Sequence, residues 1–476
     1  MSLKKNFLWN SSFQLVRIIT PLVTTPYLAR VLGSEGLGAY SYTYAIANYA
    51  CLFVLLGINQ YGNREVAKAR LSRAELSRTF SSIFAMQVLW GVAVTLLYLG
   101  YALFFAGANR LYSLIWLLWV VAEIFDVSWF FFGLEEFKVM TIRNLLVRVL
   151  VILSIFLFVR TADDVWVYCL LQAAAYLISS VVLIPMLKER VDWTRPSFHQ
   201  IAVHVKPNLT LFAPVIAITL YVQANKLILG WFSGMSEVAF YDNADKISII
   251  PLSVIQSLGT VMLPRMSRVR AMGNPEQARG YFDATIWFGS VMAFGFAFGI
   301  VAISPEFVPV FFGPGFGACI VLMPMLAAII PAVAWSNALG VQWLLPAERD
   351  KQYLLSVAVG ALVNLSLCVL LVPSMASMGA ALATISAEFA VTGVQAFLLR
   401  NELPLGTYVR EGIPYAVCGA LMLLAVRLVA GILPPHAMGL VVEILVGVLA
   451  YGFMCGVWLI ARRDKHIGLL IGKRKG

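Results

Sequence analysis

The chain has 476 residues, of which 61% are hydrophobic and only 12% are charged, whereas about 25% of the residues in a typical soluble domain are charged. A soluble globule cannot bury that much apolar surface, so the composition excludes a cytosolic enzyme, a disordered chain and a fibrous protein. The net charge of +11 would suggest a nucleic-acid partner in a soluble protein, but its meaning here depends on where the charges lie.

A membrane-spanning helix needs about 20 mostly apolar residues, and fourteen runs of the chain meet this requirement. The sequence therefore predicts an all-α polytopic membrane protein of about 14 transmembrane helices. The first run carries Arg17 in its middle, which argues against a cleaved signal peptide. In chain order the predicted spans are 7–30, 36–61, 79–106, 112–133, 144–160, 166–187, 208–232, 238–263, 282–304, 316–340, 352–372, 379–399, 412–432 and 439–461.

The loops between these spans differ sharply in charge. One set, which includes both termini, holds most of the 35 Lys and Arg residues, while the opposite set holds only Arg30, Arg110 and Arg160. Because cytoplasmic loops carry the excess of Lys and Arg, both termini are expected in the cytoplasm. The net positive charge is then mostly a topology signal, and no nucleic-acid partner is expected.

Two stretches of the chain, 5–80 and 206–281, resemble each other at a fixed offset of 201 residues, which aligns Gly33 with Gly234 and Tyr40 with Tyr241. Each stretch has a tight Ser-Glu turn between two spans and ends in an Arg-rich loop. Six spans separate the two starts, so the halves are expected to be parallel repeats, as in several transporter families. This pattern predicts two six-helix lobes around a central cavity, namely an N-terminal lobe over 1–207 and a C-terminal lobe over 208–400. Helices 13 and 14 and a basic tail would occupy 401–476.

Prolines fall inside several predicted spans, and those in the first and seventh spans are placed almost symmetrically. Each proline removes a backbone hydrogen bond that neighbours or cavity water must replace. The prolines are interpreted either as static kinks or as hinges, and the near-symmetry favours hinges. They are Pro21, Pro26, Pro214, Pro251, Pro324 and Pro331.

Basic side chains inside the bilayer are costly, so each needs a reason. Arg17 lies near the centre of the first span, where it either holds an anion in a wet cavity or pairs with a carboxylate for structure. Lys226 and Lys246 either extend an anion path or snorkel outward, and an Asp242–Lys246 pair on one helix face is the structural alternative. With Arg30, these cations form the candidate anion-binding set.

Acidic side chains also lie deep in predicted spans. Glu123 and Asp126 are three residues apart in the fourth span, so we expect them on one face of that helix, either carrying a coupling proton or cation or pairing with Arg17. Glu388 is the third candidate for ion coupling. Arg427 and Glu443 lie at similar depth in the last two spans and are predicted to form a structural pair.

The second span carries Tyr40, Tyr44 and Asn48 at one-turn spacing. Aromatic rings beside an amide suit sugar rings, although the tyrosines alone also fit an ordinary interfacial belt. The six cysteines are expected to be buried as small hydrophobic residues. No catalytic motif, metal-ligand spacing or complete phosphate-binding loop is present, so we expect no metal, no cofactor and no enzymatic activity.

Several short stretches stand out along the chain, namely 28–40, 56–66, 228–230, 237–241, 263–265, 311–313, 344–346, 360–364 and 379–381. They resemble the signatures of the Wzx-type polysaccharide repeat-unit (O-antigen) flippases, which belong to the multidrug/oligosaccharidyl-lipid/polysaccharide (MOP) superfamily. Their order and spacing carry the resemblance through the twelfth span. One departure is Asn225, since relatives often carry an acid at this position.

The resemblance implies a bacterial inner-membrane flippase for lipopolysaccharide or other surface polysaccharide synthesis. Its substrate would be a short glycan on undecaprenyl diphosphate, moved from the cytoplasmic to the periplasmic leaflet by alternating access. Polysaccharide polymerase and chain-length machinery are the partners it suggests. The alternatives are a drug or cation exporter of the same superfamily and a membrane polymerase or ligase, which would need a larger outer loop than this chain has.

Overall fold

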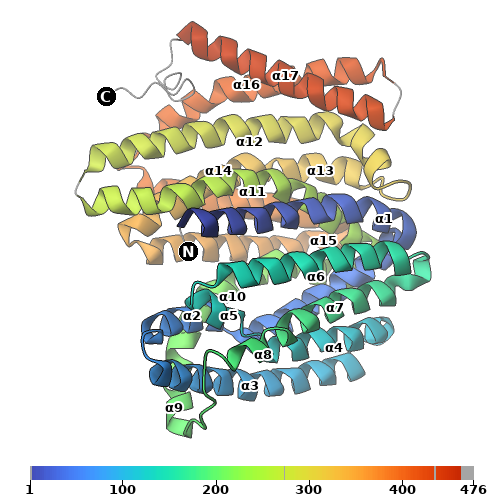
Figure 1. The fold of residues 1–476 in the computed structure, drawn as a ribbon. Coiled ribbons are helices and arrows are strands. Elements are labelled where there is room, and N and C mark those ends of the chain that lie inside the picture. Colours follow the sequence, from blue (N-terminus) through green and yellow to red (C-terminus); the bar gives the residue numbers. More distant parts are fainter. Residues whose placement is uncertain (1–2, 273, 434–435, 463–476) are drawn as a thin grey trace. The chain divides into compact units, whose positions relative to one another are not determined.

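The computed structural model describes residues 3–272, 274–433 and 436–462. The side chains of residues 3–19 and 462, and of some residues between 213 and 275, lie outside that description. Every regular element among the described residues is helical, which confirms the predicted fold class (Figure 1). The elements of the first part of the chain are α1 (Leu3–Leu55), α2 (Ile58–Ala69), α3 (Arg73–Phe104), η1 (Gly107–Asn109), α4 (Arg110–Ile124), α5 (Ser128–Gly133), α6 (Phe137–Phe158), η2 (Ala162–Asp164), α7 (Val165–Val181), α8 (Ile184–Leu187), α9 (Phe198–Ala202) and α10 (Val205–Phe232).

The later elements are again helices, including one π-helical segment, η3. They are α11 (Met235–Ala271), α12 (Pro275–Phe311), α13 (Cys319–Ala327), α14 (Ile329–Ser336), η3 (Asn337–Leu344), η4 (Leu345–Ala347), α15 (Asp350–Leu399), α16 (Leu405–Ala430) and α17 (Ala437–Arg462).

The helices account for the fourteen predicted spans. Ten segments among the described residues are helical, long and apolar enough to cross a membrane. Two of them, Thr20–Ala69 and Asp350–Leu399, are 50 residues long. Asp350–Leu399 carries two predicted runs, and α1 carries the first run and most of the second, which ends in α2. The predicted seventh and eighth spans lie on α10 and α11. The chain is therefore a multi-pass membrane protein.

The two longest helices each contain one sharp bend. In α1 the bend lies at Gly33, whose φ of 68° is open to glycine because it has no Cβ. In α15 it lies at Ala376, whose φ of 48° is costly for a residue with a side chain. The helix runs through Pro21 and Pro26, and their interpretation as kinks or hinges stays a prediction.

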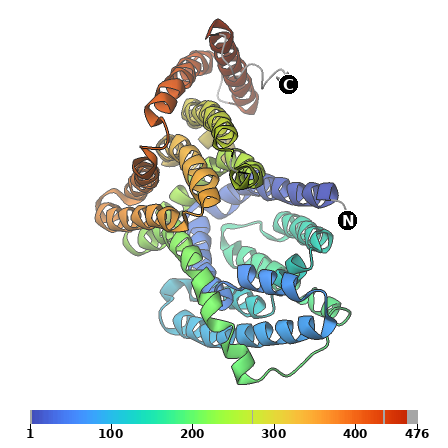
Figure 2. The same ribbon diagram turned by 90° about the vertical axis from the view of Figure 1, so that its left-hand side faces the viewer.

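The chain divides into two compact units, Met1–Ala239 and Phe240–Gly476. In the first unit, α4 packs against α1, α3 and α7, and a hydrophobic core surrounds Trp129 and Phe130. In the second unit, α12 packs against α13, α14 and α16, and α17 packs against α16. Figures 1 and 2 both show α16 and α17 side by side. The lobe boundaries at residues 207 and 400 stay predictions.

The cysteines lie where the sequence predicts. All six are buried and none forms a disulfide, which confirms that they serve as small hydrophobic residues. Among the described residues, no group of three or more His, Cys, Asp or Glu side chains is placed to hold a metal ion.

Candidate functional site

Six aromatic rings from three helices of the first unit form one cluster. Tyr40 stacks on Tyr168 with 4.2 Å between ring centroids, and Trp119 stacks on Tyr176 at the same distance. Tyr44 stacks on Trp119 at 5.0 Å, while Trp116 touches both Tyr40 and Tyr44. Tyr40 and Tyr44 thus pack against α4 and α7, and the cluster fixes the orientation of Trp119.

A cavity of about 340 Å³ begins at this cluster. Its described wall comes from the end of α1, the start of α2, α4 and α10, all in the first unit. Two of the predicted site residues, Asn48 and Glu123, line it together. The polar or aromatic residues of the wall are Asn48, Asn59, Gln60, Trp119, Glu123 and Thr219, and the rest of the described wall is aliphatic apart from Cys51 and Gly57.

The wall at Gly57 depends on a close approach of two backbones. A Cβ on this glycine would lie 2.5 Å from the carbonyl oxygen of Asn208 and 3.0 Å from the backbone nitrogen of Phe212, both on α10. Only glycine leaves room for this approach. The preceding residue, Leu56, has a φ of 49°, and α1 ends just before it. The break between α1 and α2 is therefore held against α10 beside the cavity.

Glu123 stands one residue before the end of α4, because the predicted fourth span is broken. α4 ends at Ile124 and α5 begins at Ser128. Three backbone oxygens at this break share the two N–H groups of one amide: Gln87 Nε2 on α3 donates to the oxygens of Glu123, Ile124 and Asp126 at 2.9, 3.2 and 2.9 Å. The oxygen of Glu123 also accepts from the backbone nitrogen of Asp126 at 3.3 Å.

Gln87 is fully buried, and its carbonyl oxygen accepts a hydrogen bond from the indole of Trp129 at 3.0 Å. Both ends of the amide are therefore used. An unpaired backbone group in the bilayer costs several kcal/mol. Gln87 therefore stabilises the helix break by pairing its backbone oxygens.

The break separates the two acids that the sequence placed on one helix face, so that expectation is wrong. The carboxylate of Asp126 accepts hydrogen bonds from the backbone nitrogen and the hydroxyl group of Ser128, at 3.0 and 2.5 Å. Asp126 thus stabilises the start of α5 through these hydrogen bonds, whereas Glu123 lines the cavity. Among the described residues, Glu123 forms no salt bridge.

The predicted anion-binding residues belong to three helices, α1, α10 and α11. Arg17 lies on α1, but its side chain falls outside the described part of the chain. The guanidinium of Arg30 is exposed and donates to the backbone oxygen of Pro26 at 2.8 Å. Lys226 is half-buried on α10 in the first unit, whereas Lys246 belongs to the second.

The ammonium of Lys246 lies 2.6 Å from the carboxylate of Asp242, which confirms the structural pair that the spacing predicted. Glu388, the remaining coupling candidate, is half-buried on α15 in the second unit, and its backbone oxygen accepts a hydrogen bond from the hydroxyl of Thr392 at 2.9 Å.

The prediction that Arg427 pairs with Glu443 is wrong, because Arg427 pairs with Glu306. Arg427 Nη1 lies 2.6 Å from Glu306 Oε2 on α12 and donates to the backbone oxygen of Ala302 at 3.2 Å. Glu443 is 1% exposed, and its Oε2 has no hydrogen-bond partner among the described residues. Because α12 packs against α16, the carboxylate that reaches Arg427 comes from α12.

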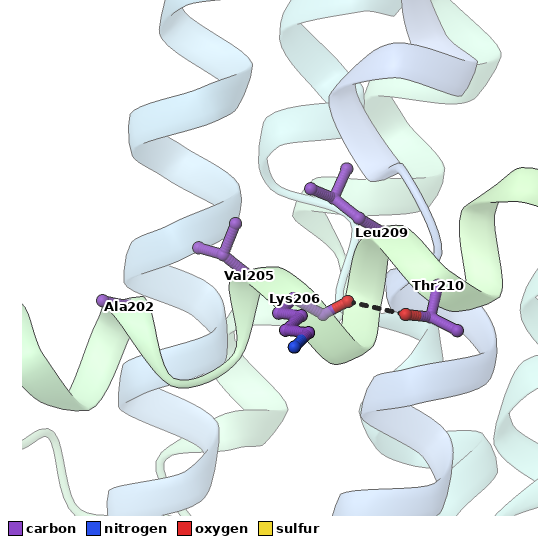
Figure 3. Close-up of a pocket in the computed structure, with 5 residues that line it drawn as sticks. All are labelled: Ala202, Val205, Lys206, Leu209 and Thr210. Atoms are coloured by element: carbon purple, nitrogen blue, oxygen red, sulfur yellow. Dashed lines mark hydrogen bonds between the residues drawn. The ribbon is translucent and has the colours of Figure 1, made fainter.

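A second hollow lies at the start of α10 (Figure 3). It is a broad groove lined by Ala202, Val205, Lys206, Leu209 and Thr210, and the hydroxyl of Thr210 donates to the backbone oxygen of Lys206 at 3.0 Å. Ligand sites usually bring polar groups together from several elements. The described wall of this groove comes from α10 and the end of α9, so the cavity at Glu123 is the better candidate site.

Sequence analysis did not single out His204, which joins three helices of the first unit. Its Nδ1 lies 2.6 Å from the hydroxyl of Tyr61 on α2, and its Nε2 lies 2.8 Å from the hydroxyl of Ser82 on α3. Ser82 donates to backbone carbonyls of its own helix, so it accepts from Nε2–H, and Tyr61 donates to Nδ1. The arrangement satisfies a neutral imidazole.

The same fold occurs in solved structures. The chain matches "Lipid II flippase MurJ, inward closed conformation" with a TM-score of 0.79 at 14% identity, covering 96% of this chain and 100% of that one. It also matches "Inward-facing conformation of a multidrug resistance MATE family transporter of the MOP superfamily" with a TM-score of 0.66 at 14% identity, covering 82% and 96%. The fold is therefore that of the MOP-superfamily membrane transporters.

Two curated relatives carry the name "Putative O-antigen transporter". The one from Escherichia coli (strain K12) is 23% identical over 84% of this chain and 98% of its own length. The one from Shigella dysenteriae is 21% identical over 76% and 91%. Residues 3–270 match the family model described as "Polysaccharide biosynthesis protein". Since this match spans more than half of the chain, the protein belongs to that family.

Proposed function

We propose that the protein moves lipid-linked oligosaccharide repeat units across the bacterial inner membrane for O-antigen or other surface polysaccharide synthesis. The observation that carries the proposal is the polar cavity at Glu123, built among membrane-spanning helices of a chain from the polysaccharide biosynthesis family. A glycan would lose its hydration in hydrocarbon, so its passage needs a wall of hydrogen-bonding groups inside the bilayer. The activity is transport, with no covalent change in the substrate.

The transported molecule is a glycan on undecaprenyl diphosphate, moved from the cytoplasmic to the periplasmic leaflet by alternating access. Arg17, with Arg30, Lys226 and Lys246 as further candidates, attracts the diphosphate, while the polyprenyl tail stays in the bilayer. Both termini face the cytoplasm in this proposal. Polysaccharide polymerase and chain-length machinery then receive the product in the periplasm.

The membrane potential can supply the driving force. The diphosphate carries about two negative charges and moves from the negative to the positive side. At about 2.3 kcal/mol per charge per 100 mV, the potential favours export by about 4–5 kcal/mol at 100 mV. A coupled ion is therefore optional in thermodynamic terms.

The test is flipping of an undecaprenyl-diphosphate-linked glycan in proteoliposomes, with the potential and the pH gradient set separately. We expect the potential alone to drive accumulation of the glycan on the positive side. Failure of the purified protein to move any such lipid under either gradient would contradict the proposed function. A need for the pH gradient would contradict only the electrophoretic account.

A second function, export of cationic drugs, is favoured by one observation: the cavity wall contains a carboxylate, which attracts cations. The fold is shared with a multidrug transporter. Accumulation of a fluorescent cationic dye in cells with and without the protein distinguishes the two, because a glycan flippase leaves dye accumulation unchanged.

A further inference from the structure

The groups that line the cavity at Glu123 suit only one part of the proposed substrate. That substrate has an anionic diphosphate, an apolar polyprenyl tail and a neutral or polar glycan. The described wall offers the carboxyl group of Glu123, the amides of Asn48, Asn59 and Gln60, and the aromatic ring of Trp119.

The diphosphate is a poor occupant because the carboxylate of Glu123 would repel it, and like charges interact strongly away from bulk water. The polyprenyl tail is also a poor occupant, because it would leave a carboxyl group and several amides without hydrogen bonds. Sugar hydroxyl groups both donate and accept, so they satisfy amide nitrogens, amide oxygens and a carboxylate at once.

The size of the cavity agrees with a sugar rather than a bare ion. A water molecule takes about 30 Å³ of liquid volume, so the cavity of about 340 Å³ is roughly ten times larger than a single ion or water needs. Small-molecule sites begin at about 300 Å³. A cavity of this volume suits one or two sugar rings.

The wall is also held in place before any ligand arrives. Trp119 stacks against Tyr44 and Tyr176, and the break in the backbone after Glu123 is fixed by the three hydrogen bonds from Gln87. Ordered groups of this kind lower the entropic cost of binding.

From these observations we propose that the cavity is the glycan subsite of the transport path and that Glu123 is its specificity-determining residue, accepting hydrogen bonds from sugar hydroxyl groups. This assignment rests on the proposed function. It gives Glu123 a role different from ion coupling: a coupling residue affects every transported lipid, whereas a glycan-reading residue affects only lipids that carry sugar.

The experiment compares two lipids in proteoliposomes that contain the full chain: an undecaprenyl-diphosphate-linked oligosaccharide, whose transport is measured, and undecaprenyl diphosphate without sugar, used as a competitor. For Glu123→Gln we expect the apparent KM for the glycan-bearing lipid to rise by about 10- to 100-fold, the range for losing a hydrogen bond to a charged group. The inhibition constant of the bare lipid should stay within about twofold of the wild-type value.

Asn48→Leu should produce the same split between the two lipids, and it keeps the test available if Glu123→Gln does not fold. Glu75→Gln is the matched control, because Glu75 is exposed in the first turn of α3. Its two constants should equal those of the wild type.

Three outcomes would overturn the inference. An equal rise in the apparent KM of the glycan-bearing lipid and in the inhibition constant of the bare lipid would identify a diphosphate or coupling site. If both constants were unchanged in both variants, the cavity would not contact the glycan. In either case the proposed function would stand, because the wild type still transports. If the wild type moves no lipid-linked glycan, the proposed function fails and the subsite fails with it.

Discussion

The hydroxyl groups of Ser34 and Ser236 lie 3.1 Å apart, although 202 residues separate them in the chain. Each serine belongs to the turn between the first two helices of one repeat. The glycines that the repeat aligns, Gly33 and Gly234, both have positive φ, at 68° and 94°. Both turns thus contain a glycine with positive φ, and their serine hydroxyl groups contact each other.

Gly38 sets how closely the two turns approach, because a Cβ at this position would overlap the carbonyl group of Met235. We predict that Gly38→Ala pushes the turns apart at a cost of about 1–3 kcal/mol, as for other overpacked contacts. The measurement is cross-linking between Ser34→Cys and Ser236→Cys, which should form readily in the parent and poorly with Gly38→Ala. Gly100→Ala is the control, because nothing lies within 4 Å of its Cβ position. Equal cross-linking in all three would show that the contact does not depend on Gly38.

Arg17 is the strongest candidate for holding the diphosphate. We predict that Arg17→Ala abolishes translocation while the protein still reaches the membrane, and that Arg17→Lys keeps part of the activity, because a point charge attracts phosphate without the planar fork. Complementation of a deletion strain, with the membrane level measured by immunoblot, checks both. Arg110→Ala, an exposed arginine, should complement fully. Full complementation by Arg17→Ala would refute the anion-binding role.

The Arg427–Glu306 pair ties α16 to α12. We predict that Arg427→Met lowers the free energy of unfolding by about 1–2 kcal/mol, less than for a fully buried pair because the arginine side chain is 39% exposed. Arg427→Met combined with Glu306→Gln should be less destabilised than the sum of the two single changes. Thermal unfolding in detergent measures all three. Additive losses would indicate that the two side chains do not interact.

His204 is expected to make the stability of the first unit depend on pH. Burial is the largest influence on the pKa of His204 and lowers it, and the opposing attraction of Glu65 is weaker. The unfolded chain, with a histidine pKa of about 6.5, therefore binds a proton more readily than the folded chain. The stabilising contribution is full above pH 6.5 and is lost as the pH falls through the lower, folded-state pKa. We predict a falling unfolding temperature below pH 6.5 and a flatter profile for His204→Gln. The same slope in both proteins would assign the effect to another group.

Gln87 pairs three backbone oxygens and one indole, so its loss should be costly. We predict that Gln87→Leu, which keeps the size of the side chain, destabilises the protein by about 3 kcal/mol, because several buried polar groups lose their partners. Detergent-solubilised unfolding measures the loss. Gln172→Leu is the comparison, since its amide makes one long hydrogen bond of 3.4 Å to Tyr168. Equal stability of the two variants would contradict the role given to Gln87.

Hydropathy and length were enough to predict the helices, because the bilayer requires continuous apolar runs with internally paired backbones. The repeat also aligned Gly33 with Gly234, and both glycines have positive φ. What failed were inferences about which side chains meet. The break after Ile124 contains neither Pro nor Gly, and its carbonyl groups accept hydrogen bonds from Gln87 on another helix. No local sequence pattern therefore predicts this break.

The candidate site was predicted in part, because polar residues inside apolar runs are visible in the sequence whereas their tertiary neighbours are not. Asn48 and Glu123 stood out as polar residues inside apolar runs, and they line one cavity. That they share a wall with Asn59 and Gln60 depends on the break at Gly57 and on the packing of α4, which are tertiary features. Arg427 was matched with Glu443 by depth alone, whereas the packing of α12 against α16 decides the partner.

The amide of Gln87 also bears on how the chain enters the membrane during synthesis. α3 emerges first with a buried amide that has no partner on its own helix, and the break between α4 and α5 follows with the backbone oxygens of Ile124 and Asp126, which accept from that amide. Each segment alone would expose polar groups without hydrogen-bond partners to lipid, whereas the two together pair these groups with each other. The expected unit of insertion is therefore a helical hairpin of α3 with α4 and α5, which leaves the translocation channel only after the whole stretch up to residue 133 has been made.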